Sequence, residues 1–366
     1  MKAIGNFIFA GGFTLGVEKY FDVVAHLEDG SFGVLSAKQH WPELPIETKP
    51  ERWREAAREA LGRSRLDLLY CNPPCAAWSK AGKFVKHGAG AYAIETNEGY
   101  LNCTRRAADL AFDLEPRLWV WESVTQAWEF GQQFTMALAK RWLEHGYGVT
   151  LLFTDLCLHG VPQRRARLFF IAHQNPLTPA LAELKPMPTP SFGELLNGLY
   201  QPGDPIANTG FLFNIIKQMR RAKAWGSVRE FHDKHLSTGI KRVHSTGIEV
   251  NAGRPSFLIK RMRPDGYIGV ISGGATQVHP FEDRLLSVRE SQVLGGWPAD
   301  FEFVGTPNQQ YAQVGKAVQP AVAEYLARQL AETNFKKRLA RPELTIIDHR
   351  PLTKSKPIVV QTVQVV

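Results

Sequence analysis

The sequence lacks the features of membrane and secreted proteins. Its apolar runs, such as Leu151–Phe153 or Leu168–Ala172, are far shorter than the roughly 20 residues that a membrane-spanning helix needs. At the N-terminus, Gly5 and Asn6 interrupt the chain before an apolar segment of signal-peptide length can form. We therefore predict no membrane span and expect a cytoplasmic protein.

Cysteine is scarce, and its spacing does not suggest a metal site. The four cysteines are Cys71, Cys75, Cys103 and Cys157, and no histidine pair with finger-like spacing accompanies them. In a reducing compartment they are free thiols by default. We expect no structural metal and no disulfide framework.

Acidic residues are outnumbered, and the excess of basic residues lies in the middle of the chain. Lys and Arg total 44 against 35 for Asp and Glu, which gives a formal charge of +9. Residues 214–263 hold twelve basic and three acidic residues, so this segment carries an excess equal to the whole net charge. Such a run is either a solvated face or a polyanion-binding segment.

Short apolar runs alternate with helical patterns through the first half of the sequence. The expected strands are Phe7–Ala10, Val23–Leu27, Leu66–Tyr70, Leu118–Trp121, Val149–Thr154 and Arg167–Ala172. The expected helices begin at Leu15–Tyr20 and continue with Glu51–Leu61, Thr104–Asp113, Phe134–His145, Ser287–Leu294 and Pro320–Thr333. This alternation predicts an α/β fold with a doubly wound parallel sheet and helices on both faces.

Prolines and glycines cluster after Asn175, where the periodicity fades. We therefore predict a catalytic and cofactor-binding domain over 1–173, a small domain over 174–303, a return to the first domain over 304–340, and an extended or loose tail over 341–366.

Two groups of residues suggest a ligand crevice. Phe9, Gly11 and Gly12 lie in a glycine-containing turn between the first expected strand and a helix, where a sheet can present backbone N–H groups to a nucleotide. Alone, the turn could be only a tight connection. Glu28 and Asp29 end the next strand, where a carboxylate can accept hydrogen bonds from ribose hydroxyls.

Reactive side chains follow two further strands. Pro73 and Pro74 immediately precede Cys75 and hold its backbone rigidly, and a polar, Gly-rich segment from Ser79 to Gly99 follows. Glu122 ends another strand among aromatic residues. The alternatives are an inert core cysteine and a surface carboxylate.

Two arginines precede the strand at 168–171. Arg165 and Arg167 are two residues apart, so on an extended chain they lie on the same side. They could orient a carboxylate and a pyrimidine carbonyl, or could simply guard a sheet edge.

Taken in order, these motifs resemble the DNA cytosine-C5 methyltransferases. The matching blocks are Phe9–Gly16, Glu28, Pro73–Cys75, Glu122–Val124, Gly160–Arg167, Arg284–Phe301 and Tyr311–Val322. The Pro-Pro-Cys and Gln-Arg-Arg-x-Arg blocks are the most specific.

The resemblance implies a covalent methyl transfer from S-adenosylmethionine. Cys75 would add to C6 of a flipped cytosine, Glu122 would hold the N3 edge, and Arg167 would bind the base carbonyl and steady Glu122. Arg165 would help to hold the cysteine loop. The cofactor residues would be Phe9 on adenine and Glu28 on ribose, with Gly11, Gly12, Asp29, Pro73, Lys316 and Ala317 around them.

The resemblance also implies double-stranded DNA as the partner. The segment from about Asn175 to Asp283 takes the place of the target-recognition region, and it is longer than in the tRNA-methylating branch. The expected DNA contacts are Ser79, Gln163, Arg220, Arg221, Lys241, Arg242, Lys260 and Arg261. We expect a monomer of bacterial or phage origin, acting as a restriction partner, an orphan enzyme or in phage self-protection.

The sequence departs from the family pattern at several positions. The first glycine block is one residue shorter, Ala76 replaces a glutamine, Ser123 replaces an asparagine, and an arginine is missing before Gly99. An Asp-Ile pair for the adenine amine is not evident before Cys75.

Lys316 is the departure with the largest chemical consequence, since it replaces an asparagine beside the cofactor. An ammonium about 4 Å from a sulfonium costs about 4 kcal/mol at an effective dielectric of about 20. A carboxylate on the transferred group would make the interaction favourable. One alternative is therefore carboxymethyl transfer from carboxy-S-adenosylmethionine, and another is that Lys316 reaches DNA phosphate or the cofactor's own carboxylate. An inactive sequence-specific DNA-binding protein is the third interpretation.

Overall fold

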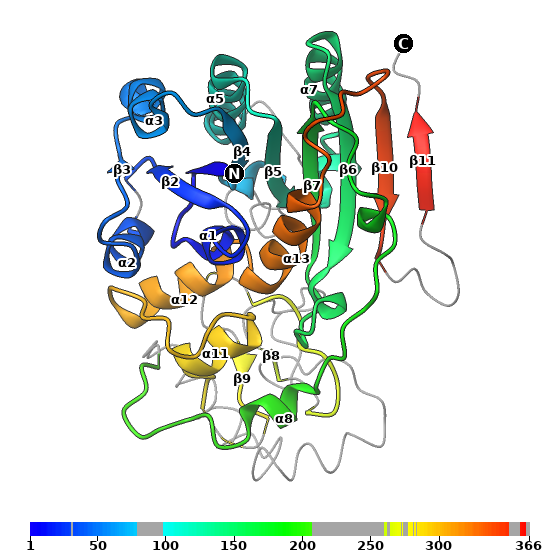
Figure 1. Cartoon of the computed structure of the whole chain (residues 1–366). Helices are drawn as coiled ribbons and strands as arrows, with labels where there is room; N and C mark the ends of the chain where they lie inside the picture. Colours follow the sequence, from blue (N-terminus) through cyan, green and yellow to red (C-terminus); the bar gives the residue numbers. More distant parts are fainter. Residues whose placement is uncertain are drawn as a thin grey trace. The chain divides into compact units, whose positions relative to one another are not determined.

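The computed structural model describes most of the chain as two compact units (Figure 1). The described residues are 1–30, 32–78, 98–206, 260–261, 264–271, 273, 277–280, 282, 284–350 and 359–363. Unit 1 comprises 1–155, 166–186 and 317–366, and unit 2 comprises 156–165 and 187–316. Unit 1 therefore extends past the expected boundary at 173. It resumes at residue 317 rather than 304, and it includes the tail.

Unit 1 is built on a nine-stranded sheet with the order β11-β10-β6-β7-β5-β4-β1-β2-β3. The strands are β1 (Lys2–Asn6), β2 (Asp22–Leu27), β3 (Ile46–Glu47), β4 (Leu66–Cys71), β5 (Leu118–Val124), β6 (Gly148–Asp155), β7 (Ala166–His173), β10 (Leu344–Asp348) and β11 (Val359–Val363). Five strands that are adjacent in the sheet, β3, β2, β1, β4 and β5, run parallel to one another, so their carboxyl ends meet at one edge. Strand β7 runs antiparallel to β5 and β6, so the sheet is mixed rather than wholly parallel.

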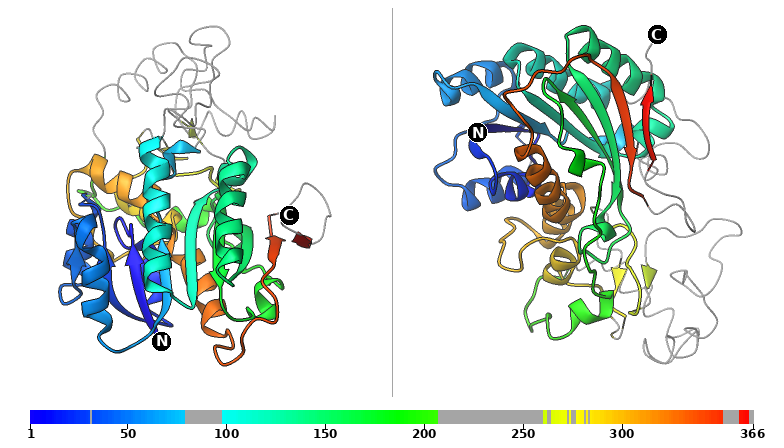
Figure 2. Two further views of the ribbon diagram at one scale, coloured as in Figure 1. Left: turned by 90° about the horizontal axis from the view of Figure 1, so that it is seen from above. Right: turned by 45° about the vertical axis from the view of Figure 1, so that its right-hand side comes forward.

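Helices cover both faces of this sheet. Figure 2 shows α3 (Trp53–Leu61), α5 (Glu98–Leu114) and α7 (Gln132–Glu144) on one face, and α1 (Gly12–Val17) and α13 (Pro320–Ala331) on the other. The remaining elements of unit 1 are α2 (Gly33–His40), α6 (Gln126–Glu129) and the 3-10 turns η1 (Pro50–Arg52), η2 (Cys75–Ala77) and η5 (Pro179–Leu181). The doubly wound architecture is confirmed.

Apolar burial explains why these segments fold as they do. Strands β4, β5 and β6 are buried at every position, as expected for strands covered on both faces. Their side chains form one core with Trp53 of α3, Ala107 of α5 and Trp142 of α7. On the other face, α1 and α13 approach so closely that a Cβ on Gly16 would lie 2.3 Å from the backbone nitrogen of Glu324. The late segment therefore returns to pack against the first helix.

Unit 2 has less regular structure in its described part. It contains η4 (Leu156–Leu158), α8 (Phe192–Leu196), β8 (Lys260–Arg261), β9 (Gln277–Val278), α11 (Val288–Leu294) and α12 (Pro307–Lys316). Helices α8 and α11 each begin with a capping box, Ser191 with Glu194 and Ser287 with Glu290.

The first strand was predicted in the wrong place. It spans Lys2–Asn6, and the aromatic run at 7–10 forms the turn that follows. Phe7 and Phe9 have left-handed backbones with φ of 51° and 53°, a conformation that cannot continue a strand. The tail was predicted as extended or loose, and within it β10 and β11 are extended strands that join the sheet.

Candidate active site

Cys75 lies at the carboxyl edge of the sheet, on the turn that leaves β4. It opens the short helix η2, and the N–H of Trp78 donates to its carbonyl at 3.0 Å. Pro73 is buried and Cys75 is half-buried, so the turn holds the thiol at the surface of the core. By contrast, Cys71 is fully buried, and this burial raises the pKa of its thiol well above the usual value. Of these two, Cys75 is placed to react.

Glu122 stands near the end of β5, held by two donors. Its side chain is 4% exposed. Nε of Arg167 lies 2.9 Å from Oε1 of Glu122, and Nδ2 of Asn72 donates to Oε2 at 2.5 Å. The structure therefore brings Glu122 and Arg167 together, and it adds Asn72, which the sequence analysis did not identify.

The register of the sheet explains this arrangement. Cys71 lies opposite Trp121 in the parallel β4–β5 pair, so Asn72 and Glu122 are the next residues on neighbouring strands. Arg167 lies opposite Val124 on the antiparallel strand β7. The pairing of Asn72 with Glu122 could have been found by placing the two expected strands side by side in this register.

A second carboxylate, Glu28, follows β2 at the same edge. It is 2% exposed, and its oxygens accept from the backbone N–H groups of Phe9 at 2.6 Å and Asp29 at 3.0 Å. Burial raises the pKa of this carboxyl to about 8. The side chain of Asp29 itself is exposed.

The turn after β1 has the geometry of a ligand cradle. Gly11 has φ of +86°, and a Cβ there would lie 2.2 Å from the ring of Trp41, so this position requires glycine. Gly12, the first residue of α1, is buried. The half-buried ring of Phe9 packs edge-on against Phe32 at 5.2 Å.

These residues fit an adenosine. A flat aromatic ring, a buried carboxylate that can accept from two hydroxyls and a turn without a side chain at Gly11 suit a base, a ribose and a close backbone approach. The ring, the carboxylate and the turn therefore agree with a nucleoside cofactor at the carboxyl ends of β1 and β2.

Arg165 and Gln163 are anchored inside unit 2. Arg165 is buried, and its guanidinium donates to the carbonyls of Ile271 at 2.9 Å and Gly315 at 2.8 Å. Gln163 is 0% exposed, donates to the carbonyl of Leu294 at 3.0 Å and accepts from the N–H of Ile271 at 3.1 Å. Backbone groups occupy both ends of its amide, and the expected contact of Gln163 with DNA stays a prediction. The expected action of Arg165 on the cysteine loop stays a prediction.

The two predicted cofactor residues near 316 differ in exposure. Lys316 is the exposed last residue of α12, and a Cβ on Gly273 would lie 2.9 Å from its Cε. The glycine therefore leaves room for the lysine stem. Ala317 is 1% exposed.

Most predicted DNA contacts fall outside the described residues. These are Ser79, Arg220, Arg221, Lys241 and Arg242. Lys260 and Arg261 form β8, which pairs with β9, and only their backbone is described.

Neither a membrane helix nor a metal site is found in the part of the chain that the structure describes. Each helix there is too short or too polar to cross a bilayer. In the same residues, no cluster of three or more His, Cys, Asp or Glu side chains could hold a metal ion.

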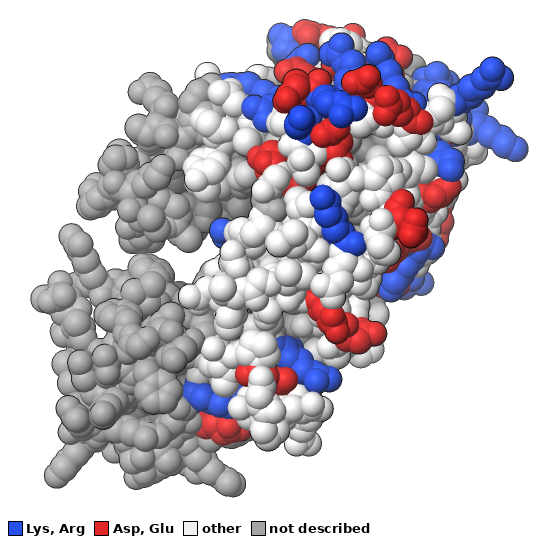
Figure 3. Space-filling model, turned by 90° about the vertical axis from the view of Figure 1, so that its left-hand side faces the viewer, with Lys and Arg blue, Asp and Glu red and all other residues white. Residues whose placement is uncertain are grey.

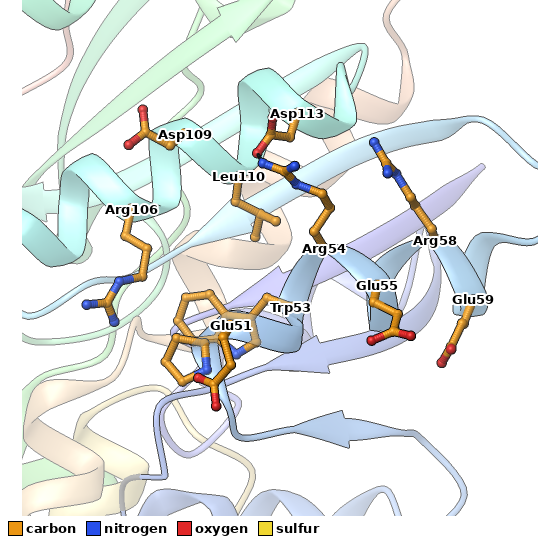
Figure 4. Close-up of a pocket in the computed structure, with 11 residues that line it drawn as sticks. Glu51, Trp53, Arg54, Glu55, Arg58, Glu59, Arg106, Asp109, Leu110 and Asp113 are labelled. Carbon is orange, nitrogen blue, oxygen red and sulfur yellow. Dashed lines mark hydrogen bonds and ion pairs between the residues drawn. The ribbon is translucent and has the colours of Figure 1, made fainter.

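A separate groove of about 570 Å³ lies between α3 and α5 (Figure 4). Basic and acidic side chains alternate along it, including Arg54 paired with Asp113, and the ring of Trp53 forms part of its lining. Figure 3 shows the same mixture of charges at the top of the molecule. The groove has five acidic and three basic lining residues and no cysteine, so it suits neither DNA nor the chemistry at Cys75.

Comparisons with known proteins agree with this geometry. The family model for C-5 cytosine-specific DNA methylase matches residues 1–332. Type II methyltransferase M.HgiDI from Herpetosiphon aurantiacus is 25% identical over 346 residues, covering 90% of this chain and 94% of the relative. Type II methyltransferase M.HindV from Haemophilus influenzae is 24% identical over 344 residues, covering 93% and 99%.

Solved structures show the same fold. Entamoeba histolytica methyltransferase EhMeth superposes with a TM-score of 0.60 at 13% identity, covering 90% of this chain and 97% of that one. The matched family uses S-adenosylmethionine, in agreement with the adenosine-like site. The chain belongs to the C-5 cytosine-specific DNA methylase family and is a DNA (cytosine-5-)-methyltransferase.

Proposed function

We propose that this enzyme methylates C5 of a flipped cytosine through a covalent bond between Cys75 and C6 of the base. The observation that carries the proposal is the pairing of Glu122 with Arg167 and Asn72 at the end of β5, beside the strand that leads to Cys75. A nucleophile and an anchored carboxylate at one sheet edge are what addition to a pyrimidine needs.

The thiol chemistry accounts for every bond. The Cys75 thiolate forms a bond to C6, and the electron pair of the C5=C6 bond makes C5 nucleophilic. After C5 has gained the methyl group, it loses its proton to a base, and the freed pair re-forms the C5=C6 bond. The sulfur of Cys75 leaves with its own electron pair, which regenerates the enzyme.

Glu122 and Arg167 stabilise the base during this addition. The carboxyl of Glu122 holds the N3 and exocyclic amine edge and shares a proton there as negative charge enters the ring. Arg167 holds Glu122 through Nε and has further guanidinium N–H groups for the base carbonyl. Arg165 is proposed to help hold the cysteine loop.

Phe9, Glu28 and the turn at Gly11 are the residues of this chain that would hold S-adenosylmethionine, with Gly12, Asp29, Pro73 and Ala317 near by. When bound, S-adenosylmethionine supplies the electrophilic methyl group, and its sulfur keeps the electron pair of the broken bond. Glu28 binds the ribose best as a carboxylate, because both hydroxyls can then donate to it.

The basic segment at 214–263 is proposed to bind the DNA phosphates and to read the target in the major groove. Because C6 is inaccessible inside a duplex, the cytosine must leave the base stack to reach Cys75. The expected DNA contacts therefore remain Ser79, Gln163 and the basic residues of this segment.

Trapping tests the covalent step directly. Duplex DNA with 5-fluorocytosine should form a denaturation-resistant complex with the wild-type enzyme in the presence of S-adenosylmethionine, because fluorine at C5 prevents the final elimination. Cys75→Ser should form no such complex but should still bind the DNA in a filter-binding assay. A Cys103→Ser control should be trapped like wild type, and trapping of Cys75→Ser would contradict the mechanism.

A second candidate is carboxymethyl transfer from carboxy-S-adenosylmethionine. It rests on the ammonium of Lys316, which is exposed at the end of α12 in place of the asparagine of the resembled family. An ammonium attracts a carboxylate on the transferred group and repels a sulfonium. Wild type and Lys316→Asn, each given either cofactor, separate the two: loss of carboxymethylcytosine in the variant favours this candidate, and 5-methylcytosine alone from both proteins excludes it.

A further inference from the structure

We propose that Asn72 is a positioning residue that fixes the carboxylate of Glu122 for catalysis. The inference rests on the proposed function, because it assumes that Glu122 acts on the base.

The two oxygens of Glu122 are held from opposite strands. Oε1 faces Nε of Arg167 on β7 at 2.9 Å, and Oε2 accepts from Nδ2 of Asn72, after β4, at 2.5 Å. A carboxylate fixed at both oxygens cannot rotate about its last bond without breaking one contact. Its orientation toward a base is thus set before the base arrives.

The backbone beside Asn72 cannot take over this role. Residues 73 and 74 are prolines and have no N–H, and the N–H of Asn72 itself donates to the carbonyl of Asn6 at 3.3 Å. The side-chain amide of Asn72 therefore supplies a hydrogen bond to Glu122 that the backbone N–H groups of residues 72–74 cannot. Asn72 is half-buried and Glu122 is 4% exposed, so water is a poor substitute.

The neighbouring residue Ser123 makes Glu122 more dependent on Asn72. Its hydroxyl is buried and makes no hydrogen bond to the described residues. The side chain that donates to Glu122 is that of Asn72, which follows β4, rather than that of the residue after Glu122.

Tritium release measures the effect of Asn72 on turnover. Plasmid DNA copied with tritium at C5 of cytosine releases one tritium for each base that is modified. We expect Asn72→Ala to lower kcat about 10- to 100-fold, the effect of losing a hydrogen bond to a charged group, while KM for S-adenosylmethionine changes less than threefold. Asn102→Ala, an exposed change on α5, is the control and should match wild type.

Two further variants separate positioning from a merely structural role. Asn72→Asp is nearly the same size but puts a second carboxylate against Glu122, so it should lose more activity than Asn72→Ala. In a Glu122→Gln background, adding Asn72→Ala should cost less than threefold, because the group on which Asn72 acts has already changed.

The outcomes distinguish this inference from the proposed function. An active wild type whose Asn72→Ala variant keeps kcat within twofold, or loses the same factor with and without Glu122→Gln, overturns the role of Asn72 alone. An Asn72→Asp variant as active as wild type does the same. A wild type that releases no tritium overturns the proposed function, and this inference with it.

Discussion

At the scale of single residues, the two carboxylates of the site have different electrostatic environments. Glu122 is paired with the guanidinium of Arg167, whereas Glu28 is buried, accepts from the backbone N–H groups of Phe9 and Asp29, and also interacts with the carboxyl of Asp29. Burial without a cation raises the pKa of Glu28 to about 8. Glu28 therefore gains and loses its proton near neutral pH.

This shift makes the stability of the protein depend on pH. The folded-state pKa of Glu28 lies above its unfolded value of about 4.5, so its contribution to stability is complete below pH 4.5 and is lost as the pH rises toward 8. The loss is at most about 1.4 kcal/mol per pH unit. Urea unfolding from pH 5 to 9 should show a smaller decline for Glu28→Gln than for wild type.

The buried histidines also make stability depend on pH, but comparing wild type with Glu28→Gln removes their contribution. Burial lowers the pKa of His26 to about 3 and of His173 to about 4, so their effect appears as the pH falls below 6.5 and is the same in both proteins. Parallel stability curves for wild type and Glu28→Gln would contradict a raised pKa at Glu28.

At the scale of elements, the start of α11 depends on a buried ion pair. Glu290 is 0% exposed, caps the helix by accepting from the N–H of Ser287, and receives Nη1 of Arg284 at 2.6 Å. The ring of Tyr200 lies 4.0 Å from the guanidinium carbon of Arg284. The carboxylate of Glu290 thus connects the N-terminal cap of α11 to Arg284, and Arg284 in turn contacts the ring of Tyr200.

Removal of the arginine should leave the buried carboxylate of Glu290 poorly compensated, with Nε2 of His279 3.6 Å from its Oε1. We expect Arg284→Leu to lower the free energy of unfolding by about 3–5 kcal/mol, measured by urea denaturation. Arg328→Leu, an exposed change on α13, serves as the matched control and should change it by less than about 0.5 kcal/mol. A loss no larger than in this control would show that Glu290 has another partner of equal strength.

At the scale of the whole molecule, the sheet extends beyond the segment that the family model matches. That segment ends at residue 332, and β10 then pairs with β6 while β11 pairs with β10. Leu344 is 0% and Ile347 5% exposed. The late strands therefore cover an edge of β6 that would otherwise offer unpaired backbone groups.

Truncation after Ala340 tests this role. The shortened chain should unfold at a lower temperature, since two buried aliphatic side chains contribute about 3 kcal/mol or more, and should scatter more light as its concentration rises. A chain that ends after Val363 keeps both strands and is the control. An unchanged Tm in the shorter chain would contradict the role of β10. The expectation of a monomer stays a prediction that the same scattering measurement addresses.

Much of the fold could be predicted because buried strands are continuous apolar runs. β4, β5, β6 and β7 were placed within a few residues of their observed bounds. β1 was misplaced because Gly5 and Asn6 are poor strand residues, and its burial depends on neighbours that only the folded sheet provides. The antiparallel direction of β7 likewise has no local signal.

The order of the motifs predicted the site, but its inner contacts depend on the fold. Glu122 and Arg167 were expected together and are in contact. Asn72 was missed because its partner is set by the register between β4 and β5, and the burial of Gln163 depends on segments more than one hundred residues away.

The most direct test of the central claim is nucleoside mass spectrometry of unmethylated plasmid DNA after incubation with the enzyme and S-adenosylmethionine. Wild type should give 5-methyldeoxycytidine, and Cys75→Ala should give none. Product from Cys75→Ala would contradict the covalent mechanism. No modified cytosine from wild type, with either S-adenosylmethionine or its carboxy form, would contradict the assignment of an active enzyme.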